Sequence, residues 1–289
     1  MDLLVNVCSG IISGLIATGI IVLYHYFCRH LQRRRIRHLI WRKCPPAYSI
    51  CVIYPVFVVE NNYKLLCFNK NKRQKGSSEK TIVDNFVAES EILAYRFIVN
   101  LLNSAEIEHK LESDFESNNN YWQGDILSLG LSNSESERIL AANRLISVEN
   151  GDWIIKGREE PIMPSDDPYG IILRTTINGK TRLLCGGFND FGTVGAARVF
   201  SEQNKKIIRI LNKYYFKIDP FAFFPRPDFL VIVKGENNYS NNFGVFEVWT
   251  IGWWKEPVML YHDNEGSAPP IEITTTTVTA KETTTTTTM

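Results

Sequence analysis

The longest hydrophobic stretch of the chain lies at its beginning, where residues 3–28 contain no Asp, Glu, Lys or Arg. A helix of this length measures roughly 39 Å at about 1.5 Å per residue, more than the roughly 30 Å of hydrocarbon in a bilayer. A cleaved signal peptide carries its basic residues before the apolar stretch. Here they follow it, as Arg29, Arg33, Arg34, Arg35, Arg37, Arg42 and Lys43. The pattern predicts a transmembrane helix over residues 1–28 and a basic juxtamembrane segment over residues 29–46.

The charges on either side of this stretch predict its orientation. Only Asp2 and the α-amino group precede it, whereas arginines follow it. Because basic flanks stay in the cytoplasm, we expect a single-pass protein of the cell's inner (plasma) membrane, with its N-terminus outside and a cytoplasmic soluble domain. The apolar residues among the arginines, such as Ile36 and Trp41, could lie along anionic headgroups. Alternatively, the basic segment only stops translocation.

Two glycines within the stretch predict a contact between copies of the chain. Gly10 and Gly14 form a GxxxG pattern, which Thr18 extends. Small residues four positions apart allow membrane helices to approach closely, so the pattern predicts a homo-oligomer through Gly10 and Gly14. Small residues are also common in spanning helices that do not associate, and this alternative stays open.

Strand and helix patterns alternate along residues 47–266, the predicted soluble α/β domain. Strands are expected at 48–54 and 57–59, 64–68, 107–111, 124–130, 153–155, 169–174, 181–185, 229–233 and 243–249, and helices at 82–103, from 131 and at 193–214. Alternation of this kind predicts a Rossmann-like three-layer domain around a mostly parallel sheet. Asn178-Gly179 predicts an added β-hairpin. Residues 267–289 are rich in Thr and lack apolar residues, so a disordered tail is expected.

Composition does not change the predicted fold, but it argues against several kinds of partner and site. The formal net charge is +1, which gives no bulk attraction to nucleic acid, and no nucleic-acid partner is expected. The six cysteines form no CxxC pair and the five histidines show no ligand spacing, so neither a metal site nor a cofactor is predicted. Cys185 ends a buried strand and is interpreted as a core thiol.

Two loops share one construction, in which a strand, a glycine, a polar turn and a helix start follow one another. They span residues 129–133 and 185–193. Such loops line the crevice at the carboxyl ends of parallel strands, where a helix start favours an anion. The predicted ligand-binding residues are Gly130, Ser132, Asn133, Arg174, Gly187, Asn189, Gly192 and Thr193. The alternative is turn geometry alone, with Ser132 and Glu135 as a capping box.

The second loop differs from the known phosphate loops. Gly187 and Gly192 have the spacing of a Walker A motif, but Thr193 occupies the position of its lysine. Without that lysine an ATPase is excluded. No catalytic triad or paired carboxylate stands out either, so the catalytic residues are unknown and the sequence leaves open whether the protein is an enzyme.

Three strings carry a resemblance: Gly124-Asp-Ile-Leu-Ser-Leu-Gly-Leu-Ser-Asn133, Asp167-Pro-Tyr-Gly-Ile-Ile-Leu-Arg174, and the loop from Leu184 to Ala197. Together they resemble an uncharacterised bacterial family of membrane-anchored Rossmann-like domains. The family's GG-x-x-SN pattern is altered here to Gly130-Leu131, and Pro168 precedes the tyrosine. The resemblance implies a sensing or nucleotide-related domain, in signalling or antiviral defence, and assigns no reaction.

Three functions are compatible with these features. The first is a membrane-tethered intracellular sensor of a small molecule, with a nucleotide or another small anion as the candidate ligand, which signals through self-association. The second is a membrane-tethered enzyme that processes nucleotides. The third is a ligand-free scaffold that holds a partner on an aromatic surface. The residues of this predicted partner surface are Trp249, Trp253, Trp254, Tyr214, Tyr215, Phe216, Phe221, Phe223 and Phe224.

Overall fold

The structure is a computed structural model that describes residues 2–41, 45, 47–55, 57–59, 65–67, 85–86, 88–113, 124–163, 168–218, 227–235, 242–251 and 256–263. Side chains are described in these ranges except within 2–13, 57–59, 65–67, 85–86 and 216–218. The predicted tail at 267–289 therefore lies outside the described residues, and so do several aromatic residues of the predicted partner surface, Trp253 and Trp254 among them.

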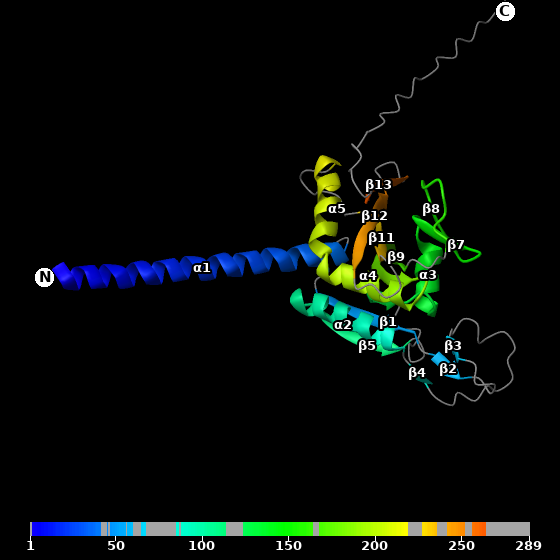
Figure 1. Ribbon diagram of the computed structural model, residues 1–289, viewed down its shortest axis with the longest axis horizontal. Helices are drawn as coiled ribbons and strands as arrows, with labels where there is room; N and C mark the ends of the chain where they lie inside the picture. The colour runs from blue at the N-terminus through cyan, green and yellow to red at the C-terminus, as the bar shows by residue number, and fades with distance from the viewer. Residues whose placement is uncertain are drawn as a thin grey trace, which may run out of the picture.

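Helix α1 (Asp2–Ile40) includes both the predicted transmembrane helix and most of the juxtamembrane segment, without a break. It projects from the rest of the protein as a single rod (Figure 1). From Gly14 to Phe27 every side chain is exposed, including Leu15 at 69% and Phe27 at 60%. Among the residues whose side chains are described, no helix combines the length and the apolar character needed to cross a membrane.

The centre of the domain is an eight-stranded sheet in the order β13-β12-β11-β9-β10-β6-β1-β5. Its strands are β1 (Ser49–Tyr54), β5 (Glu108–Ser113), β6 (Ile126–Leu129), β9 (Tyr169–Ile177), β10 (Lys180–Gly187), β11 (Phe229–Gly235), β12 (Phe243–Ile251) and β13 (Pro257–His262). Neighbours from β10 to β5 are parallel, and the other pairings are antiparallel. The α/β class is as predicted, but the sheet is mixed rather than mostly parallel.

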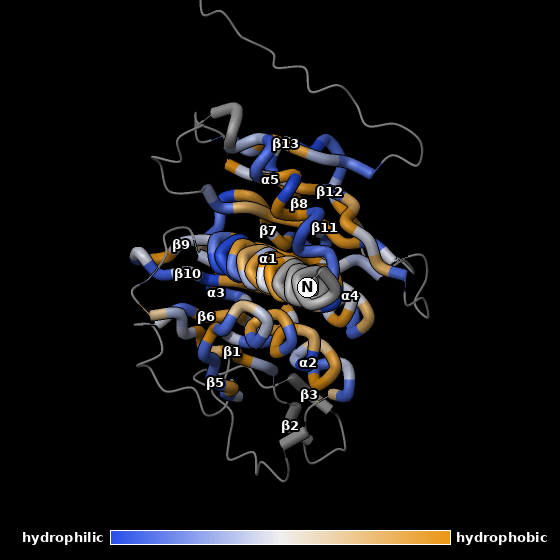
Figure 2. Tube along the Cα trace, turned by 90° about the vertical axis from the view of Figure 1, so that its left-hand side faces the viewer, coloured by the Kyte–Doolittle hydropathy of each residue, from blue (hydrophilic) through white to orange (hydrophobic). Residues whose placement is uncertain are grey.

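Helices cover both faces of this sheet (Figures 1 and 2). On one face, α2 (Glu89–Ser104), α4 (Asp190–Glu202), α5 (Asn204–Ile218) and the end of α1 pack over one cluster of buried apolar side chains. On the other face, α3 (Ser134–Ala142) and the hairpin of β7 (Ile146–Glu149) and β8 (Asp152–Ile155) cover a second cluster. A small separate sheet contains β2 (Phe57–Val59), β3 (Leu65–Cys67) and β4 (Asn85–Phe86).

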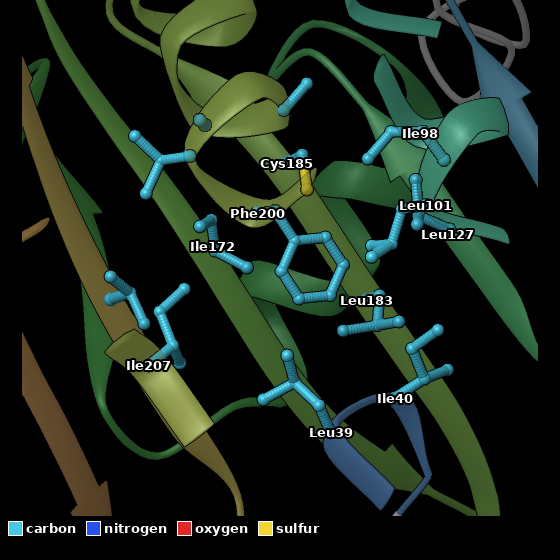
Figure 3. Packing of buried hydrophobic residues seen from close by; sticks show 14 of the residues in the cluster. Leu39, Ile40, Ile98, Leu101, Leu127, Ile172, Leu183, Cys185, Phe200 and Ile207 are labelled. Atoms are coloured by element: carbon cyan, nitrogen blue, oxygen red, sulfur yellow. The ribbon is translucent and has the colours of Figure 1, made fainter. Parts of the chain in front are cut away.

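The end of α1 is part of the domain core. The side chains at the end of α1 are at most 1% exposed, and they are Ile36, Leu39, Ile40 and Trp41. Figure 3 shows Leu39 and Ile40 beside Leu183 of the sheet and in the same cluster as Phe200. These apolar residues therefore do not lie along lipid headgroups, and this part of the segment has a structural role in the domain core. Their spacing of three and four residues is that of a buried helix face.

Polar contacts fix this helix end to the domain. Arg37 donates from Nε to the carbonyl oxygen of Ala105, at 2.9 Å, where α2 has just ended. Trp41 donates from Nε1 to a carboxylate oxygen of Asp125, at 2.6 Å, immediately before β6. Arg33 forms an ion pair of 2.8 Å with Glu106. With contacts to several elements, α1 meets the domain at a rigid joint rather than through a linker.

Element boundaries differ from the prediction where one apolar pattern covers two elements. The pattern at 82–103 contains β4 and then α2, and the pattern at 193–214 contains α4 and α5, which meet at Gln203 and Asn204. Asn204 donates from its amide to the carbonyl of Ser201, so a polar residue within the pattern marks the break. Strands β7 and β13 were not expected, since neither has a strong period-two pattern.

Gly192, at the start of α4, is packed so closely against β9 that a larger residue should not fit there. A Cβ on Gly192 would stand 2.1 Å from the carbonyl oxygen of Tyr169, which is backbone and cannot move aside. We expect Gly192→Ala to lower the free energy of unfolding by about 2–3 kcal/mol. Gly244→Ala is the control, because a Cβ there meets nothing within 4 Å. Denaturant unfolding of both variants measures the difference, and equal stabilities would contradict the close packing of α4.

Candidate functional site

Three helices begin at the edge of the sheet where β1, β6 and β10 end. We call this the carboxyl edge and define it by Pro55, Gly130 and Gly187 with the first residues of α2, α3 and α4. A Cβ on Gly130 would lie 2.8 Å from Oε1 of Glu91 in α2 and 3.3 Å from Pro55. A Cβ on Gly186 would lie 2.6 Å from Leu131. The two predicted loops thus meet at one edge, the place where α/β proteins bind ligands.

The first loop is held by its own hydrogen bonds. Gly130 has a φ of +73°, in the left-handed region that favours glycine. Asn133 is the N-cap of α3, since its side-chain oxygen accepts from the backbone nitrogen of Ser136 at 2.8 Å. The same oxygen accepts from the hydroxyl of Ser128 at 2.8 Å. The predicted capping box is therefore wrong: Asn133 rather than Ser132 is the cap, and Ser132 is exposed at this edge.

The second loop is held by close backbone packing. Asn189 is the N-cap of α4 and accepts from the backbone nitrogen of Gly192 at 2.8 Å. A Cβ on Gly187 would lie 2.4 Å from the carbonyl carbon of Gly192. Thr193 is buried behind them. These residues meet as predicted, but each already has a structural task within the chain, which is what the turn-geometry alternative expects.

Arg174 does not belong to the carboxyl edge. Gly170 lies opposite Gly187, and Arg174 lies four residues further along β9, roughly 14 Å away at about 3.4 Å per residue. Its guanidinium donates to the carbonyl oxygen of Leu39 at 2.9 Å and to that of His38 at 3.3 Å. Arg174 therefore binds the last carbonyls of α1 on the opposite side of the domain.

Glu91 is the residue of this edge that the sequence did not reveal. Its side chain is 5% exposed, in the first turn of α2. Within the described part of the chain its Oε2 is buried and has no hydrogen-bond partner. A buried unpaired oxygen is costly, because it has lost water without gaining a donor. The apolar pattern around Glu91 predicts a helix but not the burial of this side chain. A carboxylate in the first turn of a helix is common, so Glu91 did not stand out in the sequence.

The surroundings of Glu91 change its protonation. Burial, with a smaller contribution from the negative charge of Asp190, raises the pKa of Glu91 from 4.5 to about 7. Near neutral pH its carboxyl group therefore exchanges between a neutral form, which donates and accepts a hydrogen bond, and an anion, which only accepts. The negative charges of Glu91 and Asp190 would repel a phosphate group bound directly beside them.

Glu91 also predicts a pH dependence of stability. Its pKa is 4.5 in the unfolded chain and about 7 in the folded protein. The folded state thus binds the proton more tightly, and stability falls as pH rises between these values. We expect Glu91→Gln to be more stable than the natural protein above pH 7, by roughly 3 kcal/mol at most. Thermal unfolding from pH 4.5 to 8 measures this gap, which should close toward pH 4.5; a constant gap would contradict the assignment.

Several other buried polar groups have partners within the chain. Glu247 is 1% exposed and accepts from Nε1 of Trp249 at 2.7 Å and from Nε of Arg158 at 3.1 Å. Arg182 and Glu135 form a buried pair at 3.5 Å. Cys185 is fully buried, and burial raises the pKa of its thiol, as expected of a core thiol. No group of three or more His, Cys, Asp or Glu residues in the described ranges is placed to hold a metal ion.

Comparison of the chain with protein-family models, with curated proteins and with solved structures finds no match. The resemblance to bacterial membrane-anchored Rossmann-like domains therefore stays a prediction that depends on the three sequence strings alone.

Proposed function

We propose that this protein is a membrane-tethered binding module, in which α1 anchors the domain and the carboxyl edge binds a small ligand. The observation that carries the proposal is the form of α1. One helix carries large apolar side chains into solvent on every side, and then enters the domain core without a break. An exposed apolar surface as long as that of α1 marks an interaction site, and its partner must cover the helix along this length.

A bilayer is the partner that fits residues 3–28 best. The exposed side chains from Leu15 to Phe27 surround the helix rather than forming one stripe, as expected for contact with lipid on all sides. Tyr24 and Tyr26 lie just before Arg29, in the order of an aromatic belt and a basic cytoplasmic flank. The proposed orientation therefore stays that of a cytoplasmic domain, at the inner or plasma membrane.

The ligand site is proposed at Glu91, because its buried oxygen lacks a donor. A ligand with N–H or O–H groups would supply that donor. Nucleosides and nucleotides carry such groups on the base and ribose, so they stay the candidate ligands. Their phosphates would lie away from Glu91 and Asp190, toward Ser132.

Signalling is proposed to follow from association of α1 through Gly10 and Gly14. The hydroxyl of Thr18 donates to the carbonyl of Gly14 at 2.8 Å, so Thr18 keeps a compact surface beside that glycine. Because the joint with the domain is rigid, pairing of two helices would fix the distance between two carboxyl edges. A nucleotide-processing enzyme and a ligand-free scaffold are the alternatives.

Thermal unfolding of the full-length protein in detergent, against a panel of nucleosides and nucleotides, tests the ligand site. A ligand at about a hundred times its Kd adds roughly 2.7 kcal/mol of stability. We expect stabilisation that is lost in Glu91→Met. The matched control is Glu89→Met, an exposed carboxylate in the same helix turn, which should keep the effect.

The same samples separate the alternatives. Chromatography of the ligand after incubation shows it intact if the protein is a sensor and converted if it is an enzyme. Stabilisation by no compound would favour the scaffold, and stabilisation unchanged by Glu91→Met would place the site elsewhere.

A further inference from the structure

Helix α5 has basic residues on its exposed face and contains no acidic residue to balance them. It contains Lys205, Lys206, Arg209, Lys213 and Lys217 and no Asp or Glu. Lys205, Arg209 and Lys213 are four residues apart and exposed, so they share one side of the helix. Ile207, Ile208 and Leu211 are buried in the domain core on the opposite side.

This basic face lies on the side of the domain from which α1 emerges. Helix α5 contacts α1. Figure 1 shows α5 at the end of the domain nearest to α1, and Figure 2, which looks along α1 from its N-terminus, shows α5 in front of the sheet. The exposed residues Arg29, Arg34 and Arg35 of α1 add to the same side.

Three acidic residues near this surface have cationic partners other than Lys205, Arg209 and Lys213. Glu106 pairs with Arg33 at 2.8 Å and Arg37 at 3.8 Å. Glu202 pairs with Arg198 at 2.9 Å, and Asp263 lies 3.8 Å from Lys206. The exposed basic residues of α5 and α1 therefore leave a net positive surface.

The rigid joint sets the distance of this surface from a bilayer. If the hydrocarbon ends near Cys28, the first core residue of α1, Ile36, lies roughly 12 Å further along the helix. The headgroup layer is about 6 Å thick and the screening length about 8 Å at physiological salt. Lys and Arg side chains on α5 therefore lie within electrostatic reach of the headgroups.

We propose that the basic face of α5, with Arg29, Arg34 and Arg35, docks on the anionic headgroups of the membrane that α1 enters. The proposal depends on the membrane anchor proposed above. Docking orients the domain so that the carboxyl edge, on the opposite side from the end of α1, opens toward the cytoplasm.

Lysine acetylation of the full-length protein in nanodiscs tests the docking surface. We expect Lys205 and Lys213 to react about fivefold more slowly in discs that contain phosphatidylglycerol than in phosphatidylcholine discs, since each basic side chain gains about 1 kcal/mol near an anionic surface. Lys156, exposed on the β7–β8 hairpin of the other sheet face, should react equally in both. High salt should abolish the difference.

Charge reversal gives a matched comparison. Arg209→Glu with Lys213→Glu should remove the protection of Lys205, whereas Arg144→Glu with Lys156→Glu, two exposed residues beside α3 and β8, should leave it. Equal rates in both kinds of disc would overturn the docking surface alone. Protein that does not elute with the discs would overturn the anchor and the surface together. Stronger protection by duplex DNA than by anionic discs would assign the surface to nucleic acid and overturn the proposal.

Discussion

A chain that begins at residue 47 is expected not to fold cooperatively, whereas one that begins at Arg29 keeps a folded domain. The shorter chain loses Ile36, Leu39, Ile40 and Trp41 from the core. Burial of each such side chain contributes about 1.5–3 kcal/mol. Together they amount to roughly 6–12 kcal/mol, as large as the total stability of many domains. Denaturant unfolding followed by circular dichroism measures the difference between the two chains.

A point substitution separates packing from chain length. In the chain that begins at Arg29, Trp41→Ala should cost about 3–5 kcal/mol, because it empties the space of a fully buried ring and releases the carboxylate of Asp125. Trp41→Phe keeps most of the ring and should cost less. A cooperative transition of equal midpoint in the chain from residue 47 would show that the domain core is complete without α1.

Arg174→Met is expected to destabilise the protein by about 3 kcal/mol or more without any effect on ligand affinity. The guanidinium donates to the carbonyls of His38, Leu39 and Pro227, and it stacks over the ring of Phe229 at 4.7 Å. Hydrogen bonds from a charged donor contribute about 1.5–3 kcal/mol each, and buried carbonyls would lose their donor. Thermal unfolding of the full-length protein in detergent measures the loss.

Two controls sharpen this expectation. Arg96→Met removes an exposed arginine of α2 and should leave stability unchanged. Arg174→Lys keeps the charge but cannot reach several carbonyls at once, so it should recover only part of the loss. Wild-type stability combined with weaker ligand binding in Arg174→Met would instead restore the role in ligand binding that the sequence predicted.

The α/β class and the hairpin could be predicted because local patterns determine them. Asn178-Gly179 adopts positive φ values of 52° and 74°, as this type of turn requires. The mixed sheet could not be predicted, since an antiparallel pair such as β9 and β11 leaves no local signal of its direction. The convergence of the loops after β6 and β10 followed correctly from the rule for parallel strands.

The roles of individual site residues were harder to predict because they depend on distant neighbours. Arg174 follows a strand pattern near a candidate loop, yet its partners are residues of α1 far away in the sequence. Glu91 gains its importance only from burial beside Gly130 and Asp190. The buried face that Ile36 and Leu39 share lies among arginines, and a basic segment of this kind is typical of a membrane flank rather than of a domain core.

The most direct test is flotation of the full-length protein with lipid in a density gradient after an alkaline carbonate wash of the membranes. We expect the protein to float with the lipid and to leave it only in detergent. The double substitution Ile16→Lys with Ile20→Lys should reduce the fraction of protein that floats with the lipid, because each charge within the hydrocarbon costs about 2.5–3.5 kcal/mol. Natural protein that stays in the wash supernatant would contradict the membrane anchor, and the docking and signalling proposals that depend on it.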